Sequence, residues 1–348
     1  EKGTLAKKIE EIGIEVKSIG IKTNKSKFKI ILEFLRVLFL LIKEIRREKP
    51  DIVHTYLYWA NIIGGIAAKI GGTRYLITSR RSMGYFKDNK KLMQLIENFV
   101  NYFTDIITVN SKEVFNDTIK REKFIKNKIK LIYNGVDHEK YKRQNINKEQ
   151  FEISDKDLVI TNVSNLIEYK GHIEFIEACN IILQNNTNVK ILLVGRDGGI
   201  RKKLEEKVNE YGLFEKIKFL GLRSDVEKIL SISDIQVLSS YEEGFSNAIL
   251  EGMSCELPLI VTNVGGNPEA IIHEVNGLVV SPKSVNELAD AMMMLISNGK
   301  LRQKFGKAGR ERVEKFFTVD IMREKYETMY LDLISNRNTN DTRRMNSV

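Results

Sequence analysis

Short runs of apolar, β-branched residues alternate with longer helical patterns along most of this chain. In the first half, the apolar runs cover residues 51–54, 75–78, 106–109 and 129–132. In the second half, they cover residues 158–163, 189–194, 217–220, 235–238 and 259–261. Strands that alternate with helices in this way are typical of parallel sheets covered by helices. The pattern therefore predicts an α/β protein with two doubly wound domains that face a central cleft.

The same pattern suggests where the domains begin and end, and a length of 348 residues is long enough for two. We expect a first domain over 1–142, a polar linker over 143–156 and a second domain over 157–317. A helix over 318–335 is expected to pack back on the first domain, followed by a disordered tail over 336–348. Residues 1–12 resemble the end of a helix that leads into the apolar run 14–16. The first domain is therefore expected to lack its opening strand, turn and helix.

The positive charge of the chain is concentrated in its first 140 residues. These hold 28 Lys and Arg against 16 Asp and Glu, a net charge of +12, whereas the remaining residues carry 28 against 30 and complete the total of +10. A basic domain favours an anionic partner such as a phospholipid surface or a phosphorylated substrate. A generally lysine-rich composition is the alternative explanation. Nucleic acid is not expected as a partner, because no recognised binding motif accompanies the charge.

One segment of this basic region has a helical pattern that suits a membrane surface. Residues 27–47 alternate apolar and basic side chains, and a second basic cluster follows over 120–130. Such a helix binds anionic membranes or, more often, covers a sheet. The two cysteines, Cys179 and Cys255, have no metal-site spacing and are expected to be buried thiols. They suit a cytoplasmic protein, and the basic first domain adds the inner face of the plasma membrane as an alternative location within the cytoplasm.

The sequence EGFSNAILE, residues 243–251, carries the clearest chemistry, because two carboxylates bracket a turn from strand to helix. With a helix that starts near Ser246, the backbone N–H groups of Phe245, Ser246 and Asn247 point out of its N-terminus, where a diphosphate or sugar hydroxyls are favoured. Carboxylates accept hydrogen bonds from vicinal hydroxyls. Glu243 and Glu251 could therefore hold a sugar at one end and a ribose at the other. Alternatively, Glu251 is an ordinary solvated helix residue.

Several segments together resemble glycosyltransferase family 4, a family of retaining enzymes with the GT-B fold of two Rossmann-like domains. The resemblance is most specific over residues 243–269, and it extends to VSNLIEYKG at 163–171. Shorter similarities lie at 193–195, 219–221, 51–54 and 133–137. The resemblance covers nearly the whole chain up to residue 335.

The resemblance implies roles for individual residues. Glu243 would face the donor sugar near the reacting carbon, Lys170 would neutralise the donor diphosphate, and Glu251 would bind the ribose. The remaining expected donor-binding residues are Asn165, Gly195, Gly244, Phe245, Ser246 and Asn247. Asn165 departs from the arginine that is common in the family, so Arg80 or Arg81 could supply a positive charge across the cleft, and we expect both on the acceptor side.

The implied activity is hexosyl transfer from a nucleotide-diphosphate sugar to a glycan or lipid-linked acceptor in surface polysaccharide biosynthesis. A UDP-sugar is slightly favoured over a GDP-sugar as co-substrate, and no other cofactor is expected. No metal site is expected either, since the DKD sequence at 155–157 precedes a strand within the linker. The alternative is a non-catalytic partner with the same fold that binds a sugar nucleotide or a membrane surface.

Overall fold

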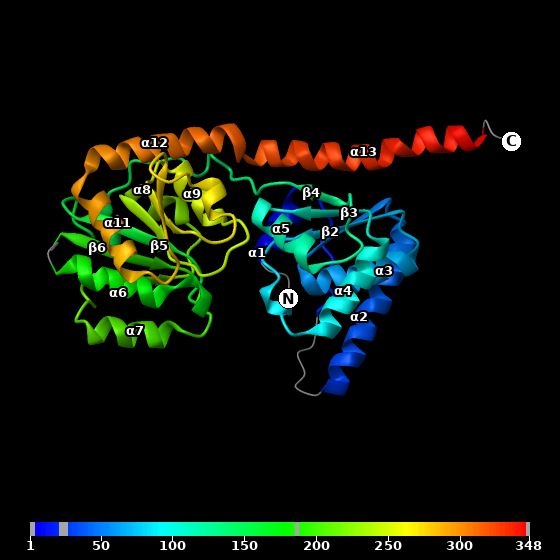
Figure 1. Ribbon diagram of the computed structural model, residues 1–348, viewed down its shortest axis with the longest axis horizontal. Helices are drawn as coiled ribbons and strands as arrows, with labels where there is room; N and C mark the ends of the chain where they lie inside the picture. The colour runs from blue at the N-terminus through cyan, green and yellow to red at the C-terminus, as the bar shows by residue number, and fades with distance from the viewer. Residues whose placement is uncertain (1–3, 21–26, 185–187, 346–348) are drawn as a thin grey trace.

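Two parallel β-sheets organise the protein, as a computed structural model shows (Figure 1). The structure describes residues 4–20, 27–184 and 188–345. Each sheet is covered by helices, and the C-terminal helices run along both halves of the molecule (Figure 1). This is the predicted α/β architecture of two doubly wound domains.

The first domain contains a four-stranded sheet with the order β1-β2-β3-β4. Its strands are β1 (Ile52–Tyr56), β2 (Tyr75–Arg80), β3 (Ile106–Val109) and β4 (Ile129–Leu131). Its helices are α1 (Thr4–Glu11), α2 (Lys27–Glu48), α3 (Tyr58–Gly71), the short 3₁₀ helix η1 (Tyr85–Lys87), α4 (Lys91–Phe103) and α5 (Lys112–Arg121). The apolar run 14–16 has no regular structure, so β1 is the first strand among the described residues.

The second domain contains a six-stranded sheet with the order β10-β9-β8-β5-β6-β7. Its strands are β5 (Leu158–Val163), β6 (Val189–Val194), β7 (Ile217–Gly221), β8 (Ile235–Leu238), β9 (Leu259–Thr262) and β10 (Gly277–Val280). The helices between them are η3 (Glu168–Lys170), α6 (His172–Leu183), α7 (Arg201–Glu210), α8 (Val226–Ile232), α9 (Asn247–Ser254), α10 (Asn267–Ala270) and α11 (Val285–Ser297). The apolar pattern predicted every strand of this sheet except β10.

The strand order of the second sheet reverses between β5 and β8. From β5 the chain moves outward through β6 and β7, and from β8 it moves in the opposite direction through β9 and β10. In open parallel sheets, ligands bind outside the carboxyl ends of the strands at such a reversal, because the two loops there diverge and leave a crevice. The loops that follow β5 and β8 are therefore the ones on which to look for a site.

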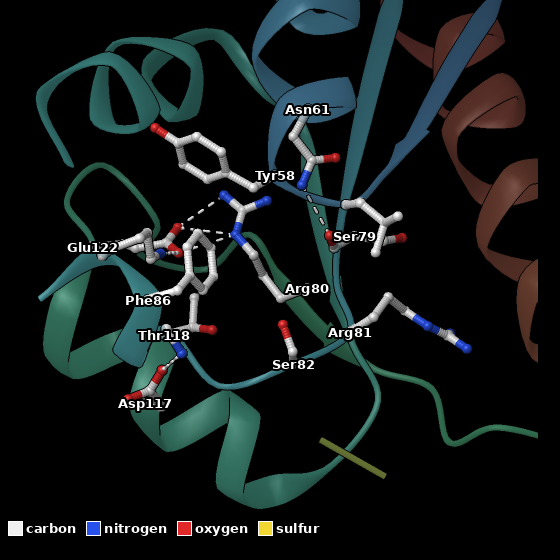
Figure 2. Close-up of a pocket in the computed structure, with 13 residues that line it drawn as sticks. Tyr58, Asn61, Ser79, Arg80, Arg81, Ser82, Phe86, Asp117, Thr118 and Glu122 are labelled. Atoms are coloured by element: carbon white, nitrogen blue, oxygen red, sulfur yellow. Dashed lines mark hydrogen bonds and ion pairs between the residues drawn. The ribbon is translucent and has the colours of Figure 1, made fainter. Parts of the chain in front are cut away.

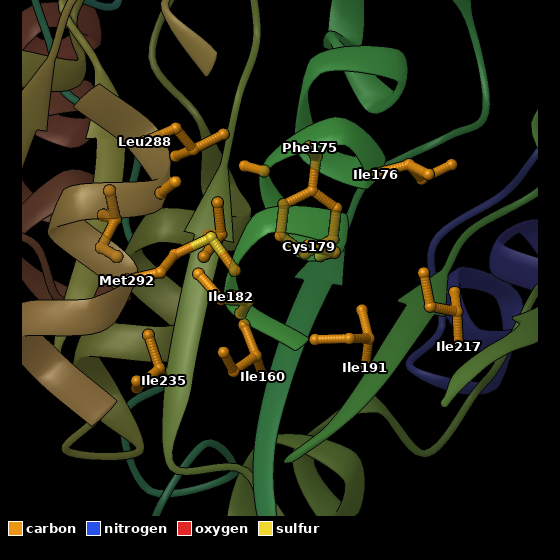
Figure 3. Close-up of a cluster of buried hydrophobic side chains, with 14 of the residues drawn as sticks. Ile160, Phe175, Ile176, Cys179, Ile182, Ile191, Ile217, Ile235, Leu288 and Met292 are labelled. Carbon is orange, nitrogen blue, oxygen red and sulfur yellow. The ribbon is translucent and has the colours of Figure 1, made fainter. Parts of the chain in front are cut away.

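The core of the second domain lies between this sheet and the helices α6 and α11 (Figure 3). Phe175 on α6 is fully buried and belongs to the same cluster as Ile160 and Ile191 of the sheet and Met292 of α11. The linker region contains the 3₁₀ helix η2 (Lys148–Phe151) and buries Ile153 against the second domain. Both sides of the sheet are thus fixed by apolar packing, which keeps the strand ends in place.

The C-terminal region connects the two domains. Helix α12 (Gly299–Phe316) covers the second domain, and α13 (Val319–Met345) continues over the first (Figure 1). Met329 of α13 is buried in a cluster with Ile77, Ile106 and Ile132 of the first domain. Helix α13 continues to Met345, so residues 336–345 of the predicted disordered tail are helical in the structure. Extending a formed helix adds one hydrogen bond for each residue that is fixed, so polar residues can continue the helix beyond its packed part. Residues 346–348 lie outside the described residues.

We predict that Phe175→Ala lowers the free energy of unfolding of the second domain by about 3–5 kcal/mol, because the substitution leaves a cavity in a closed core. Phe214 is 63% exposed in the same domain and provides the matched control. Phe214→Ala should cost no more than about 0.5 kcal/mol. Urea unfolding of both variants checks the prediction, and equal costs would contradict it.

Candidate active site

Lys170 and Glu243 meet where the loops after β5 and β8 come together. The Lys170 ammonium lies 2.5 Å from Glu243 Oε1, and the Ser240 hydroxyl donates to the same oxygen at 2.7 Å. Both charged side chains are mostly buried, with 15% and 9% of their surface exposed. Charges withdrawn from water need such partners, since an unpaired buried charge is strongly unfavourable. The reversal of the strand order thus brings together two residues that are 73 positions apart.

Backbone contacts hold these two loops in register. The Tyr241 N–H donates to the carbonyl oxygen of Tyr169 at 2.7 Å, and the Ser239 hydroxyl donates to that of Lys170 at 3.0 Å. Gly171 has φ +65°, and a Cβ atom built on it would lie 2.0 Å from the Ser239 carbonyl oxygen. Only glycine allows both this conformation and this close approach. Gly171 therefore permits the contact between Lys170 and Glu243.

Glu251 lies on the second turn of α9, the helix that follows Glu243. The helix begins at Asn247, one residue later than predicted, and the Ser246 side chain does not cap it. Burial raises the pKa of Glu251 above its ordinary value, and a hydrogen bond from the Tyr141 hydroxyl acts in the opposite direction. Glu251 is thus a half-buried carboxylate next to Tyr141, not a fully solvated helix residue.

Asn165 and Gly195 lie next to each other at the ends of β5 and β6. The Asn165 side-chain oxygen accepts from the Arg196 N–H at 3.2 Å, and a Cβ built on Gly195 would lie 2.0 Å from the Ser164 carbonyl oxygen. Asn165 is exposed. His172 is buried behind it and contacts the Asn165 carbonyl oxygen at 3.1 Å through Nε2. The three strand ends at β5, β6 and β8 therefore contribute Asn165, Gly195 and Glu243 to one edge of the sheet.

The other predicted donor-binding residues lie at the boundary between the domains. A Cβ built on Gly244 would lie 2.3 Å from the Arg81 carbonyl oxygen, so the two domains touch at this point. The Phe245 side chain is buried in the core, while its carbonyl oxygen accepts from the Asn134 amide at 2.8 Å. The same amide donates to the Asn247 side-chain oxygen at 2.7 Å.

A cavity of about 500 Å³ lies between the domains beside Glu243. The first domain contributes Met83, Tyr85, Lys112 and Glu113, and the second contributes Tyr241, Glu242, Glu243, Asn263, Val264, Gly265, Pro268 and Glu269. Its volume is within the range of small-molecule sites, about 300–1,000 Å³. The cavity is therefore large enough for part of a substrate beside the Lys170 and Glu243 pair.

Arg80 does not face this cavity. Its guanidinium is buried in the first domain and donates to Glu122 at 2.8 Å and to Asn101 at 2.8 Å (Figure 2). Lys87 completes the network by binding Glu97 at 2.5 Å and Glu122 at 2.9 Å. Burial alone would raise the pKa of Glu122, but Arg80 and Lys87 outweigh it and lower the pKa to about 2. Arg80 therefore has carboxylate partners within its own domain, and its predicted place across the cleft was wrong.

Arg81 points away from that network (Figure 2). Burial, with the positive charge of Arg81 as a smaller contribution, lowers the pKa of His54 to about 4. His54 Nδ1 lies 2.7 Å from the Tyr330 hydroxyl of α13, and its Nε2 lies 2.8 Å from the Ser79 hydroxyl. Arg81 thus lies near a polar and aromatic cluster at the carboxyl ends of β1 and β2. The structure separates the two neighbouring arginines into different environments.

Three acidic residues that line the cavity, Glu113, Glu242 and Glu269, were not among the predicted site residues. Burial, followed by repulsion from Glu243, raises the pKa of Glu242. Glu269 lines the cavity and lies at the end of the segment 243–269 that carries the resemblance. For Glu269 the signal was present in the sequence, but which domain its side chain would contact could not be predicted.

We predict that Gly171→Ala is more destabilising than Gly212→Ala. Gly212 has φ +66° and no atom within 4 Å of a built Cβ, so the two variants share the backbone strain of about 1–2 kcal/mol. Only the Gly171 variant must also displace Ser239, which should add about 1–3 kcal/mol. Denaturant unfolding of both variants measures the difference. An equal loss of stability would show that the loops have room to separate.

Comparisons with known proteins show similarity to glycosyltransferases in both domains. The family model described as glycosyl transferases group 1 matches residues 143–312, and that of glycosyltransferase family 4 matches residues 7–140. The UDP-Gal:alpha-D-GlcNAc-diphosphoundecaprenol alpha-1,3-galactosyltransferase of Escherichia coli is 27% identical over 326 residues, which cover 88% of this chain and 82% of that protein. The capsular polysaccharide biosynthesis glycosyltransferase CapM of Staphylococcus aureus is 28% identical over 336 residues, which cover 90% and 83%.

Among solved structures, that of Anabaena Alr3699/HepE in complex with UDP and glucose superimposes with a TM-score of 0.82 at 22% identity, covering 95% of this chain and 90% of that one. This likeness concerns the fold of both domains. Together the two family models account for almost all of both domains. The chain belongs to glycosyltransferase family 4 and has the GT-B fold.

Proposed function

We propose that this glycosyltransferase moves a hexosyl-type sugar from a nucleotide-diphosphate sugar to a lipid-linked or glycan acceptor in surface polysaccharide biosynthesis. The ion pair between Lys170 and Glu243 at the β5 and β8 reversal is the observation that carries the proposal. The names of similar proteins support the choice of substrates. The E. coli relative is named for a UDP-galactose donor and a diphosphoundecaprenol acceptor.

In this proposal each group of the second domain binds a different part of the donor. The Lys170 ammonium binds the diphosphate, and Glu251 binds the ribose hydroxyls. Glu243 accepts hydrogen bonds from the sugar hydroxyls near the reacting carbon. The 2.5 Å contact between Lys170 and Glu243 supports this arrangement, because the diphosphate and the sugar are joined in the donor and the groups that bind them must lie next to each other. The N-terminus of α9 adds a positive partial charge beside the same loop.

The chemical step that we propose retains the anomeric configuration. The bond from the anomeric carbon to the diphosphate oxygen breaks, and the acceptor hydroxyl oxygen attacks the same face of the sugar. The leaving phosphate oxygen takes the proton of that hydroxyl. Lys170 stabilises the charge that develops on the departing diphosphate, which is how fixed charges accelerate such reactions.

We propose that transfer needs no metal ion. Among the described residues, no three His, Cys, Asp or Glu side chains come together as metal ligands would. The Asp157 side chain instead accepts from the Ser154 N–H at 3.2 Å. A positively charged lysine at the diphosphate can take over the charge neutralisation that a metal provides elsewhere.

We predict that Glu243→Gln and Lys170→Ala each lower transfer by about 100-fold or more, since removal of one fixed stabilising group costs about 10²–10³ in rate. Transfer is measured with radiolabelled UDP- and GDP-sugars and a lipid-linked acceptor. Thermal shifts with UDP and GDP identify the base, because a ligand of the native state raises the melting temperature.

Lys218 of the second domain and Glu152 of the linker form an ion pair 2.7 Å apart, which supplies the controls Lys218→Ala and Glu152→Gln. Both controls should keep full activity, and all four variants should keep their circular dichroism spectra. Full turnover by the Glu243 and Lys170 variants would reject the site assignment. Nucleotide binding without any transfer or donor hydrolysis would favour the non-catalytic alternative.

We further propose that the first domain binds an anionic membrane, where a lipid-linked acceptor would be located. The supporting surface is the α4 stripe, which we define as Leu92, Leu95, Phe99 and Tyr102. These side chains are spaced to share one face of α4 and are 60–70% exposed. Phe124 extends the stripe, with its ring 5.7 Å from that of Tyr102.

Charge complementarity selects the membrane as the occupant of this surface. Exposed Lys91 is adjacent in the sequence to Leu92, and exposed Lys123 and Lys126 lie within two positions of Phe124. Apolar side chains flanked by lysines suit the boundary between acyl chains and anionic headgroups. Helix α2 packs against α3 with one face, on which Ile45 is buried, but Ile31, Leu35 and Phe39 are more than half exposed. Among the described residues, no helix has the length and apolarity to cross a membrane.

We predict that Phe99→Ser reduces binding to vesicles of phosphatidylglycerol and phosphatidylcholine by about tenfold, because it replaces an inserted ring by a polar group. Phe214→Ser is the control, since Phe214 is similarly exposed in the second domain, at 63% against 60% for Phe99. Vesicle flotation measures both. Equal binding by the two variants would contradict the proposed surface. So would equal binding of the wild-type protein to vesicles with phosphatidylglycerol and to vesicles of phosphatidylcholine alone.

A further inference from the structure

Glu269 of the second domain binds the first domain through three hydrogen bonds. Its Oε2 accepts from the backbone N–H of Lys112 at 2.9 Å, and its Oε1 accepts from that of Glu113 at 3.1 Å. The Tyr133 hydroxyl donates to Oε2 at 2.7 Å. All three donors belong to the first domain, so a single carboxylate connects the two sides of the cleft.

The partners of Glu269 are groups that the first domain leaves incomplete. The first N–H groups of a helix have no acceptor within the helix, and the Ser111 side chain caps α5 only at Val114. Lys112 and Glu113 are the first two residues of this ten-residue helix. A carboxylate at this end is also favoured by the helix dipole. The second domain thus supplies the acceptor that the N-terminus of α5 needs, but only when the domains touch.

The segment that carries Glu269 is tied to the loop of Glu243. A Cβ built on Gly265 would lie 1.9 Å from the Glu243 carbonyl oxygen, and Gly265 has φ +50°. The Gly266 N–H donates to the Gly244 carbonyl oxygen at 2.8 Å. On the other side, the Arg312 guanidinium of α12 donates to the Glu269 carbonyl oxygen at 2.7 Å and fixes the backbone of α10. The backbone segments of Glu269 and Glu243 are therefore fixed to each other.

Tyr133 strengthens this connection from the first domain. Its ring lies 5.0 Å from that of Phe245 and 5.4 Å from that of Phe317, both in the second domain's core. The next residue, Asn134, donates to Asn247 at the start of α9. The Tyr133 hydroxyl on Glu269 and the Asn134 amide on Asn247 thus hold this end of the first domain against the donor-binding loop.

We propose that Glu269 is a positioning residue that holds the cleft closed, with Glu243 facing the first domain, by binding the N-terminus of α5 and the Tyr133 hydroxyl. The kinetic consequence rests on the proposed function, because closure matters for transfer only if the acceptor enters from the first domain. The structural consequence does not depend on it, since the two N–H groups lose their acceptor whenever the contact is broken.

The test uses Glu269→Gln and Tyr133→Phe in the full chain, with Glu311→Gln on the exposed face of α12 as the control. Glutamine keeps the shape of Glu269 but replaces one of its two accepting oxygens by an N–H₂ group, whereas phenylalanine keeps the Tyr133 ring and removes one donor. Hydrogen exchange of the Lys112 and Glu113 amides reports the contact directly. UDP affinity and the kcat for transfer report its effect on the site.

We expect Glu269→Gln to speed amide exchange at Lys112 and Glu113 by about tenfold or more and to lower kcat to a similar extent. UDP affinity should stay within about twofold, since the proposed nucleotide contacts lie within the second domain. Tyr133→Phe should have a smaller effect of the same sign, and Glu311→Gln none.

The outcomes separate this inference from the proposed function. Unchanged exchange at Lys112 and Glu113 in Glu269→Gln would overturn the inference whether or not the enzyme is active. Faster exchange with an unchanged kcat would also overturn it, because the contact would then not position the site. If the wild-type protein transfers no sugar, the exchange result still decides whether Glu269 holds the cleft closed.

Discussion

The site depends on one ion pair, between the Lys170 ammonium and the Glu243 carboxylate, which joins the loops after β5 and β8. Bringing these two charges out of water is unfavourable unless their geometry is fixed and further hydrogen bonds complete them. The Ser240 hydroxyl supplies one such bond, and Gly171 allows the loops to approach closely enough. The pair is therefore a consequence of the strand order, because only the reversal between β5 and β8 places these loops side by side.

The first domain uses the same kinds of side chain for a different purpose. Arg80 and Lys87 face Glu97 and Glu122 in a nearly closed network, where each charge already has an opposite charge beside it. Such a network fixes the segment that leads from β2 into η1, and with it the backbone of Arg81 that touches Gly244. Complete neutralisation thus suits a structural role, whereas a charge pair beside a cavity can exchange a partner for a substrate.

The contrast between the two charge clusters shows which features of the fold and the site can be predicted from the sequence. The alternation of apolar runs predicted the parallel sheets because period and length are local properties, and the family resemblance placed Glu243, Lys170 and Glu251 in one domain. The environment of Arg80 depends on Glu122, 42 positions later, and no local pattern indicates that contact. Strand β10 was not predicted, because the strand is short, at Gly277–Val280. Burial and pairing are properties of the fold, and for Arg80 the sequence alone identified only a positively charged residue at the end of a strand.

The contacts between the domains follow a related rule. Helix α13 holds the domains together through apolar packing at Met329, which is not directional and tolerates small rotations. Glu269, by contrast, binds backbone N–H groups whose positions are fixed by α5, and hydrogen bonds weaken steeply when their geometry changes. Apolar packing can thus keep the domains associated while the cleft opens, whereas the carboxylate favours one particular closed arrangement. Because the Glu269 segment is tied to Glu243, that arrangement is also the one that places the donor-side carboxylate against the first domain.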